Sequence, residues 1–224
     1  MWKIHKMPYR IIPFDNNHYY HVFNRGVNKL AIFIDERDCN QALLSMKYYK
    51  FKKPPMKLSR FKTLSATEQS RLTTILLNKN ETLVDIVCFV LMPNHFHFIL
   101  KQNLENGVSI FMRKFSNSYA KYFSTSHEWV GHLFQGQFKA VEINSEEQLL
   151  HVSRYIHLNP FSAGLIMKNN LKYYQWSSYP DYLRKSSDVV QIITTAGDYE
   201  KFVLGHADFA RQLEYQKHFT LDDI

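Results

Sequence analysis

The stretch Leu91-Met92-Pro93-Asn94-His95-Phe96-His97-Phe98-Ile99-Leu100 predicts a turn followed by a strand. Pro93 and Asn94 are turn-forming residues, and the alternation after them is typical of a half-buried strand. Its apolar face carries Phe96, Phe98 and Leu100, and its other face carries His95 and His97. Residues two apart on a strand lie roughly 7 Å apart along the backbone, so both imidazoles can converge on one ion. We expect a metal site on an open sheet face, although an isolated His-x-His is more often a pair of surface histidines.

The flanking sequence predicts the rest of a sheet. A continuously apolar run at 86–91 indicates a central strand buried on both faces, which pairs with the histidine strand as a hairpin. Further strands are expected at 18–26 and 138–143, and helices at 36–49 and 108–123. This order, β-α-β-β-α-β, is the ferredoxin-like α+β arrangement: an antiparallel sheet with two helices on one face. The helix at 108–123 carries an aromatic stripe that we expect in the core: Phe111, Phe115, Tyr119 and Phe123.

A further helix is predicted to meet the histidines. Ser145 and Gln148 form a capping box for a helix from about Glu146 to Leu158, which Pro160 should end. His151, Tyr155 and Asn159 are spaced by four residues, so they form one polar stripe that can face the histidine side of the sheet.

Composition favours a polyanionic partner in a reducing compartment. The 224 residues carry a formal charge of +8 and are 15% aromatic, which suits single-stranded nucleic acid but equally fits a core of aromatic residues under a solvated basic surface. Two cysteines do not form a disulfide framework. No signal peptide and no long apolar run is evident, so we expect a soluble cytoplasmic protein with no membrane partner.

Two segments lie outside this plan. Residues 50–82 are expected to form an insertion with a basic loop and a short helix at 65–77. The basic loop is a candidate DNA contact, but a run of charges is more often a solvated surface, and we favour that interpretation. We divide the chain into a domain at 1–180 and a C-terminal extension at 181–224, in which 202–213 has a helical pattern and no recognisable motif.

Four motifs together carry a resemblance to a known family. They are Met-Pro-Asn-His-Phe-His at 92–97, Tyr-Ile-His-Leu-Asn-Pro at 155–160, Tyr-His-Val-Phe-Asn-Arg-Gly at 20–26 and Trp-Ser-Ser-Tyr at 176–179. In this order the chain resembles the single-tyrosine HUH transposases of the IS200-like superfamily, most closely the REP-associated tyrosine transposases, over roughly residues 18 to 180.

The resemblance implies a function and a set of site residues. His95, His97 and Asn159 would bind Mg or Mn, and Tyr155 would be the nucleophile, with Asn159 at a position where relatives can carry Gln. Two imidazoles and a carboxamide suit Mn, Ni or Zn better than Mg. The enzyme would cleave and rejoin single-stranded DNA at hairpins or imperfect palindromes through a 5′-phosphotyrosine, as a monomer or homodimer. The residues predicted to contact DNA are Asn24, Arg25, Arg113, Lys114 and Arg154.

Two other functions fit the same residues. One is a non-catalytic protein that binds single-stranded nucleic-acid hairpins, in which Tyr155→Phe would change nothing. The other is a metal-dependent phosphoesterase that hydrolyses DNA and leaves no protein-DNA adduct.

Overall fold

The computed structural model describes residues 13–193 and 199–212, and its centre is a four-stranded sheet. The strands are β1 (Tyr19–Arg25), β2 (Val84–Met92), β3 (His95–Gln102) and β4 (Lys139–Ile143). The α-helices are α1 (Glu36–Tyr49), α2 (Leu58–Phe61), α3 (Ala66–Lys79), α4 (Gly107–Ser126), α5 (Glu146–Ser162), α6 (Tyr179–Arg184) and α7 (Tyr199–Leu204). Two short 3-10 helices are η1 (Val27–Lys29) and η2 (Lys168–Tyr173).

The strands lie in the order β2-β3-β1-β4, and every neighbouring pair is antiparallel. With α1 between β1 and β2, and α4 between β3 and β4, this is the ferredoxin-like arrangement that the sequence predicts. The sheet therefore confirms the predicted fold class.

The prediction that 86–91 is a central strand is wrong, because β2 ends the sheet. Its outer edge is satisfied by a later segment: the Leu91 N–H donates to the Trp176 carbonyl at 2.8 Å, and Ser178 N–H donates to the Phe89 carbonyl at 3.0 Å. From Ile86 to Met92, β2 is buried and apolar. Like a central strand, this part of β2 is covered on both faces and along both edges, which explains its continuous apolar sequence.

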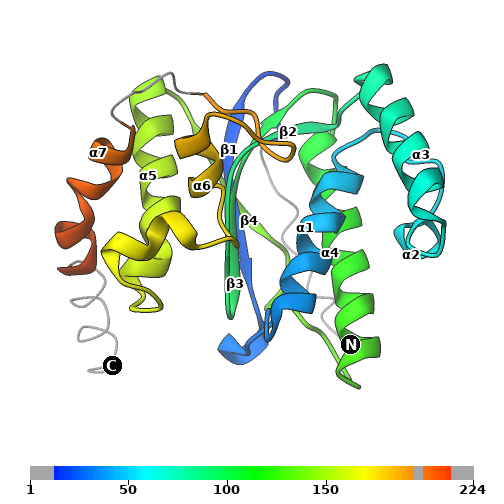
Figure 1. Cartoon of the computed structure of the whole chain (residues 1–224), viewed down its shortest axis with the longest axis horizontal. Helices are drawn as coiled ribbons and strands as arrows, with labels where there is room; N and C mark the ends of the chain where they lie inside the picture. Colours follow the sequence, from blue (N-terminus) through cyan, green and yellow to red (C-terminus); the bar gives the residue numbers. More distant parts are fainter. Residues whose placement is uncertain (1–12, 194–198, 213–224) are drawn as a thin grey trace, which may run out of the picture.

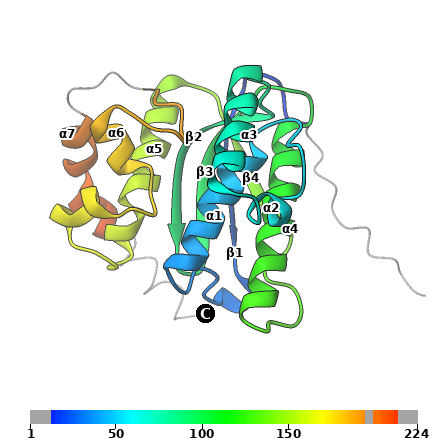
Figure 2. The same ribbon diagram turned by 45° about the vertical axis from the view of Figure 1, so that its right-hand side comes forward.

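The molecule has three layers (Figures 1 and 2). Helices α1 and α4 cover one face of the sheet, and α5 with η2, α6 and α7 lies on the other. The expectation of an open sheet face is thus wrong over β2 and β3, where α5 packs. The same face stays accessible toward β4, where Val141 is 54% exposed.

Successive side chains of β3 point to opposite faces of the sheet, as predicted. Phe96, Phe98 and Leu100 are buried in the core shared with α4, and Ile99 is buried in the second cluster beneath α5. The predicted aromatic stripe of α4 is core, since Phe111, Phe115, Tyr119 and Phe123 are all buried. His95 and His97 consequently face α5.

The insertion is folded rather than a loose loop. Ser65 caps α3 by accepting a hydrogen bond from the Glu68 N–H, and α2 and α3 enclose a small apolar cluster beside α1. The cluster contains Tyr48, Phe51, Leu58, Phe61 and Leu76. In Figure 1 this unit lies at the opposite end of the molecule from α5.

Helix α5 begins as predicted and ends later than predicted. The Gln148 N–H donates to Ser145 Oγ at 3.1 Å, and Gln148 Oε1 accepts from the Asn144 N–H at 2.8 Å. The expectation that Pro160 ends the helix is wrong, because α5 continues to Ser162. Proline removes one backbone hydrogen bond, but Pro160 and Phe161 are buried and the Ala163 N–H again donates to the Asn159 carbonyl at 2.9 Å.

The C-terminal helical pattern is interrupted. A helix begins at Tyr199, ends at Leu204, and helical residues resume at 207–212 after a turn at Gly205 and His206; Leu213 lies outside the described residues. Within 13–193 and 199–212, no helix is both long enough and apolar enough to cross a lipid bilayer.

Candidate functional site

Neighbouring side chains orient the two histidines of β3. His95 Nδ1 lies 2.6 Å from Asn94 Oδ1, and His97 Nδ1 lies 2.9 Å from His21 Nε2. Because the Nδ1 atom of each ring is engaged, Nε2 is the atom that each ring presents on its far side. In metal sites, a second hydrogen bond of this kind sets the tautomer of a ligating imidazole.

Helix α5 brings Asn159 and Tyr155 to these rings. Asn159 Oδ1 lies 3.4 Å from His95 Nε2, and the Asn159 side chain is nearly buried. One turn earlier, the Tyr155 ring lies edge-on to His97 with the ring centroids 5.6 Å apart. Tyr155 is 43% exposed, so its side chain is accessible from solvent.

The third residue of the predicted stripe points elsewhere. His151 is exposed, and its Nδ1 lies 3.2 Å from an Arg154 nitrogen. Its ring centroid is 6.1 Å from that of Phe202 on the α7 side of α5. Helical spacing therefore brings Tyr155 and Asn159 to the histidines but leaves His151 outside the cluster.

His21 is a member of the cluster that sequence reasoning did not select. It lies on β1 opposite Ile99, and its ring centroid is 5.1 Å from that of His97 and 6.2 Å from that of Tyr155. The local signal for it is the alternation of Tyr19, His21 and Phe23, which puts these side chains on one face. The sequence alone does not show that this face lies next to His97, because the contact depends on the pairing of β1 with β3.

Burial keeps the inner histidines neutral. Desolvation lowers the pKa of His21 from 6.5 to about 4, and burial, followed by the charges of His21 and His95, lowers the pKa of His97 well below its ordinary value. A neutral imidazole has a lone pair for a metal ion. Nε2 atoms of His95 and His97, with the Asn159 carboxamide oxygen, form a donor set that fits a divalent transition ion.

A buried polar network holds α5 from behind. His157 Nδ1 lies 2.7 Å from the Tyr199 hydroxyl and its Nε2 lies 2.9 Å from Ser178 Oγ, while Ser153 Oγ lies 2.9 Å from the same Tyr199 hydroxyl. Burial lowers the pKa of His157 to about 3, so the ring stays neutral. The network ties α5 to α6 and α7 within two residues of both Tyr155 and Asn159.

The residues predicted to contact DNA are scattered. Arg25 is exposed on the histidine face, level with His95, whereas Asn24 donates from Nδ2 to the Gly136 carbonyl at 3.0 Å. Arg113 and Lys114 lie on α4, on the opposite face of the sheet, and the Arg154 guanidinium stacks over Phe202 at 4.4 Å. The structure brings only Arg25 of the five next to the histidines.

A different group of side chains also has metal-ligand geometry. One ligand atom each from Asp15, His18 and Glu142 lie within 4.8 Å of one another. His18 and Glu142 form an ion pair at 2.5 Å, which by itself accounts for their proximity. The alternation of β1 and β4 puts this group on the α4 side of the sheet, away from His95 and His97.

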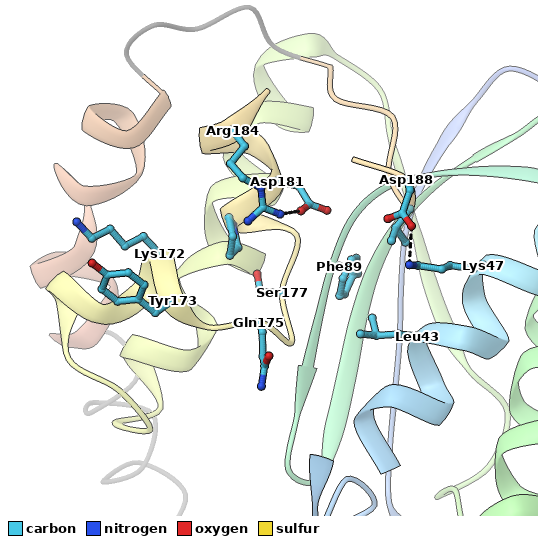
Figure 3. A pocket seen from close by; sticks show the side chains of 12 residues that line it. Leu43, Lys47, Phe89, Lys172, Tyr173, Gln175, Ser177, Asp181, Arg184 and Asp188 are labelled. Atoms are coloured by element: carbon cyan, nitrogen blue, oxygen red, sulfur yellow. Dashed lines mark hydrogen bonds and ion pairs between the residues drawn. The ribbon is translucent and has the colours of Figure 1, made fainter. Parts of the chain in front are cut away.

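A cleft of about 360 Å³ lies along the edge of β2, between α1 and the segment of η2 and α6 (Figure 3). Two ion pairs line it, Lys47 with Asp188 at 2.7 Å and Arg184 with Asp181. None of the histidines of the cluster and no part of Tyr155 lines it. This cleft is therefore separate from the candidate site.

The segment that carries the candidate site matches a known family. Residues 56–159 match the model described as Transposase IS200 like, and they include His95, His97, Tyr155 and Asn159. This match supports the resemblance to the IS200-like transposases that the sequence indicates. No curated protein sequence matches the chain.

One solved structure shares the fold, and a second is only weakly similar. A REP-associated tyrosine transposase bound to a REP hairpin superposes with a TM-score of 0.52 at 14% identity, over 85% of this chain and 95% of that one. A candidate transposase from Deinococcus radiodurans gives a TM-score of 0.35 at 12% identity, over 67% of this chain and 94% of that one. The second likeness is too weak to carry any inference, and the first establishes the fold.

Proposed function

We propose that this protein is a metal-dependent transposase that cleaves and rejoins single-stranded DNA through a 5′-phosphotyrosine on Tyr155. The observation that carries the proposal is the placement of an accessible Tyr155 beside His97, one turn of α5 before Asn159 faces His95. The family match over 56–159 supports the same reaction class.

The metal ligands in this proposal are His95, His97 and Asn159. Bound by them, Mg²⁺ or Mn²⁺ supplies electrostatic stabilisation of the charge that develops on the scissile phosphate and the departing oxygen. The hydrogen bonds of Asn94 and His21 to the Nδ1 atoms orient the two imidazoles for that role. Because His97 is neutral, no proton competes with the metal ion for the lone pair of its imidazole.

Tyr155 performs the covalent step. Its hydroxyl oxygen bonds to the phosphorus while the bond between phosphorus and the 3′ oxygen breaks. The phenol proton is lost to solvent and the departing oxygen takes one up, which gives a 5′-phosphotyrosine and a free 3′-OH. Since the new link is still a phosphodiester, a 3′-OH can attack it in the reverse sense and rejoin strands without an external energy source.

The substrate in this proposal is single-stranded DNA next to a hairpin. The structural neighbour with a TM-score of 0.52 is bound to a REP hairpin, which makes hairpin DNA the first substrate to test. The positive charge of the chain is favourable for any such polyanion.

The test uses hairpin oligonucleotides from the flanks of the gene, labelled at the 5′ or the 3′ end, with Mg²⁺ or Mn²⁺ and denaturing gels. The wild-type protein should form a covalent adduct that retains the DNA 3′ of the cut. Tyr155→Phe and His95→Ala should form none, and Tyr173→Phe, which alters an exposed tyrosine of η2, should behave as wild type.

The two alternative functions predict different results on the same gels. Cleavage without an adduct would support a hydrolase and overturn the phosphotyrosine mechanism. Binding without cleavage, unchanged in Tyr155→Phe, would support a non-catalytic hairpin-binding protein.

A further inference from the structure

The face of the sheet that carries the histidines continues past the edge of α5. Register places His97 of β3, Phe23 of β1 and Lys139 of β4 side by side on three adjacent strands. The next row along the strands holds Ile99, His21 and Val141. Helix α5 packs over β2 and β3, so Lys139 and Val141 remain exposed and Phe23 is half-buried.

Phe23 continues the row of rings that begins at the candidate metal site. Its ring stacks on His97, with centroids 5.5 Å apart and planes at 30°, and lies 5.0 Å from the His21 ring. In the register of the sheet, His97 is the neighbour of Phe23 on β3, and the exposed Lys139 is its neighbour on β4. Lys139 begins that strand, two strand spacings or about 10 Å from His97.

We propose that this exposed β1–β4 half of the sheet face binds one unpaired nucleotide of the single-stranded DNA next to the cut. The base stacks on Phe23 and a phosphate of the same strand contacts Lys139. The inference rests on the proposed function, because the Tyr155–His97 site fixes where the scissile phosphate lies, and it identifies the residues that receive the neighbouring nucleotide.

The chemistry of the surface favours a nucleotide over an apolar partner. An aromatic ring with a cation beside it matches a base and its phosphate, and base-aromatic stacking tolerates any sequence. Arg25, level with His95 on the same face, adds a second cation at the other end of the cluster. An apolar protein partner would leave Lys139 buried against it without a counter-charge.

The experiment measures binding by the full chain carrying Tyr155→Phe, so that no adduct forms. The probes are a fluorescein-labelled 12-nucleotide oligothymidylate and a 12-mer of the same length made of abasic sites, titrated by anisotropy at several salt concentrations. Phe23→Leu should weaken oligothymidylate binding roughly 5- to 100-fold, the range expected from loss of one stacked base. It should leave the abasic oligomer unchanged, and Phe23→Trp should retain tight binding.

Lys139→Gln tests the phosphate contact. It should weaken both oligomers and lower the slope of log K against log salt by about 0.7, the value for one phosphate of a single strand. Phe209→Leu and Lys79→Gln change an exposed ring and an exposed cation elsewhere and should alter neither probe.

The inference would be overturned if Phe23→Leu and its parent bound oligothymidylate equally well, or if the parent did not bind it. Neither result would affect the proposed function, which the adduct test of Tyr155 examines separately. Sedimentation velocity adds a second discriminating result. A dimer that Val141→Asp converts to a monomer would show that a second copy of the chain covers this face instead.

Discussion

Asn159 Oδ1 on α5 lies 3.4 Å from His95 Nε2 on β3, although 64 residues separate them in sequence. The contact joins the helix that carries Tyr155 to the strand that carries both histidines. Ile156 and Leu149 of the same helix are buried against β2 and β3, so packing sets the height of α5 above the sheet. The relative position of the helix and the strand therefore decides whether these residues can act together.

Two replacements of Asn159 should have opposite effects on metal affinity: alanine should lower it and aspartate should raise it. Asn159→Ala removes the oxygen donor and should lower Mn²⁺ affinity at least about tenfold. Asn159→Asp replaces it with a carboxylate, the harder donor that Mg²⁺ prefers, and should raise Mg²⁺ affinity. Isothermal titration calorimetry of the DNA-free protein measures both. Unchanged affinities in both variants would remove Asn159 from the ligand set.

His21 should act on metal binding through His97. His21→Ala removes the hydrogen bond to His97 Nδ1 and should lower Mn²⁺ affinity roughly 10- to 100-fold, as other losses of a ligand's hydrogen-bond partner do. His21→Gln, whose amide can still reach Nδ1, should recover part of that affinity. If His21→Ala binds Mn²⁺ as tightly as wild type, the orienting role is wrong.

The hydroxyl of Tyr199 should stabilise the fold through the buried network. Tyr199→Phe leaves His157 Nδ1 and Ser153 Oγ without their shared partner and should lower the free energy of unfolding by about 1–3 kcal/mol. Urea unfolding followed by circular dichroism measures the loss. Tyr173→Phe, in which the altered side chain is exposed, should stay within about 0.5 kcal/mol of wild type.

His157 should make the fold sensitive to acid. The pKa of His157 is about 3 in the folded protein and near 6.5 in the unfolded chain. Below pH 6.5 the imidazole is therefore protonated in the unfolded chain but stays neutral in the folded protein, which favours unfolding. The stabilisation is complete above pH 6.5 and is lost as pH falls. Between pH 7 and pH 5 this group should cost about 2 kcal/mol of the free energy of unfolding.

The comparison that isolates His157 is urea unfolding of wild type and His157→Gln at both pH values, with a chelator present. The variant is expected to be less stable at pH 7 and to lose about 2 kcal/mol less than wild type on going to pH 5. Equal losses in the two proteins would show that the ring does not stay neutral in the folded state.

Two predicted DNA-contacting arginines lie on opposite sides of the sheet. Arg25→Gln should weaken binding of single-stranded DNA and reduce its salt dependence, because Arg25 is exposed beside His95. Arg113→Gln removes the same charge from α4 on the far face of the sheet and should change the binding of single-stranded DNA little. Anisotropy titrations of both variants at several salt concentrations measure the two effects. A larger effect of Arg113→Gln than of Arg25→Gln would place the DNA across the α4 face.

Local sequence was sufficient for the parts of this protein that depend on neighbours along the chain. Alternation placed His95 and His97 on one face of β3, and four-residue spacing placed Tyr155 and Asn159 on one side of α5. Ser145 and Gln148 marked the start of that helix. These patterns act over a few residues, where backbone geometry alone relates one side chain to the next.

Tertiary structure decided what no such pattern contains. The strand order put β1 next to β3, which brings His21 to His97, and put β2 at the edge, where a later segment covers it. The helix continued past Pro160 because burial there outweighs one lost hydrogen bond. Pairing and packing join residues tens of positions apart, and their free energy depends on surfaces that exist only when the chain has folded.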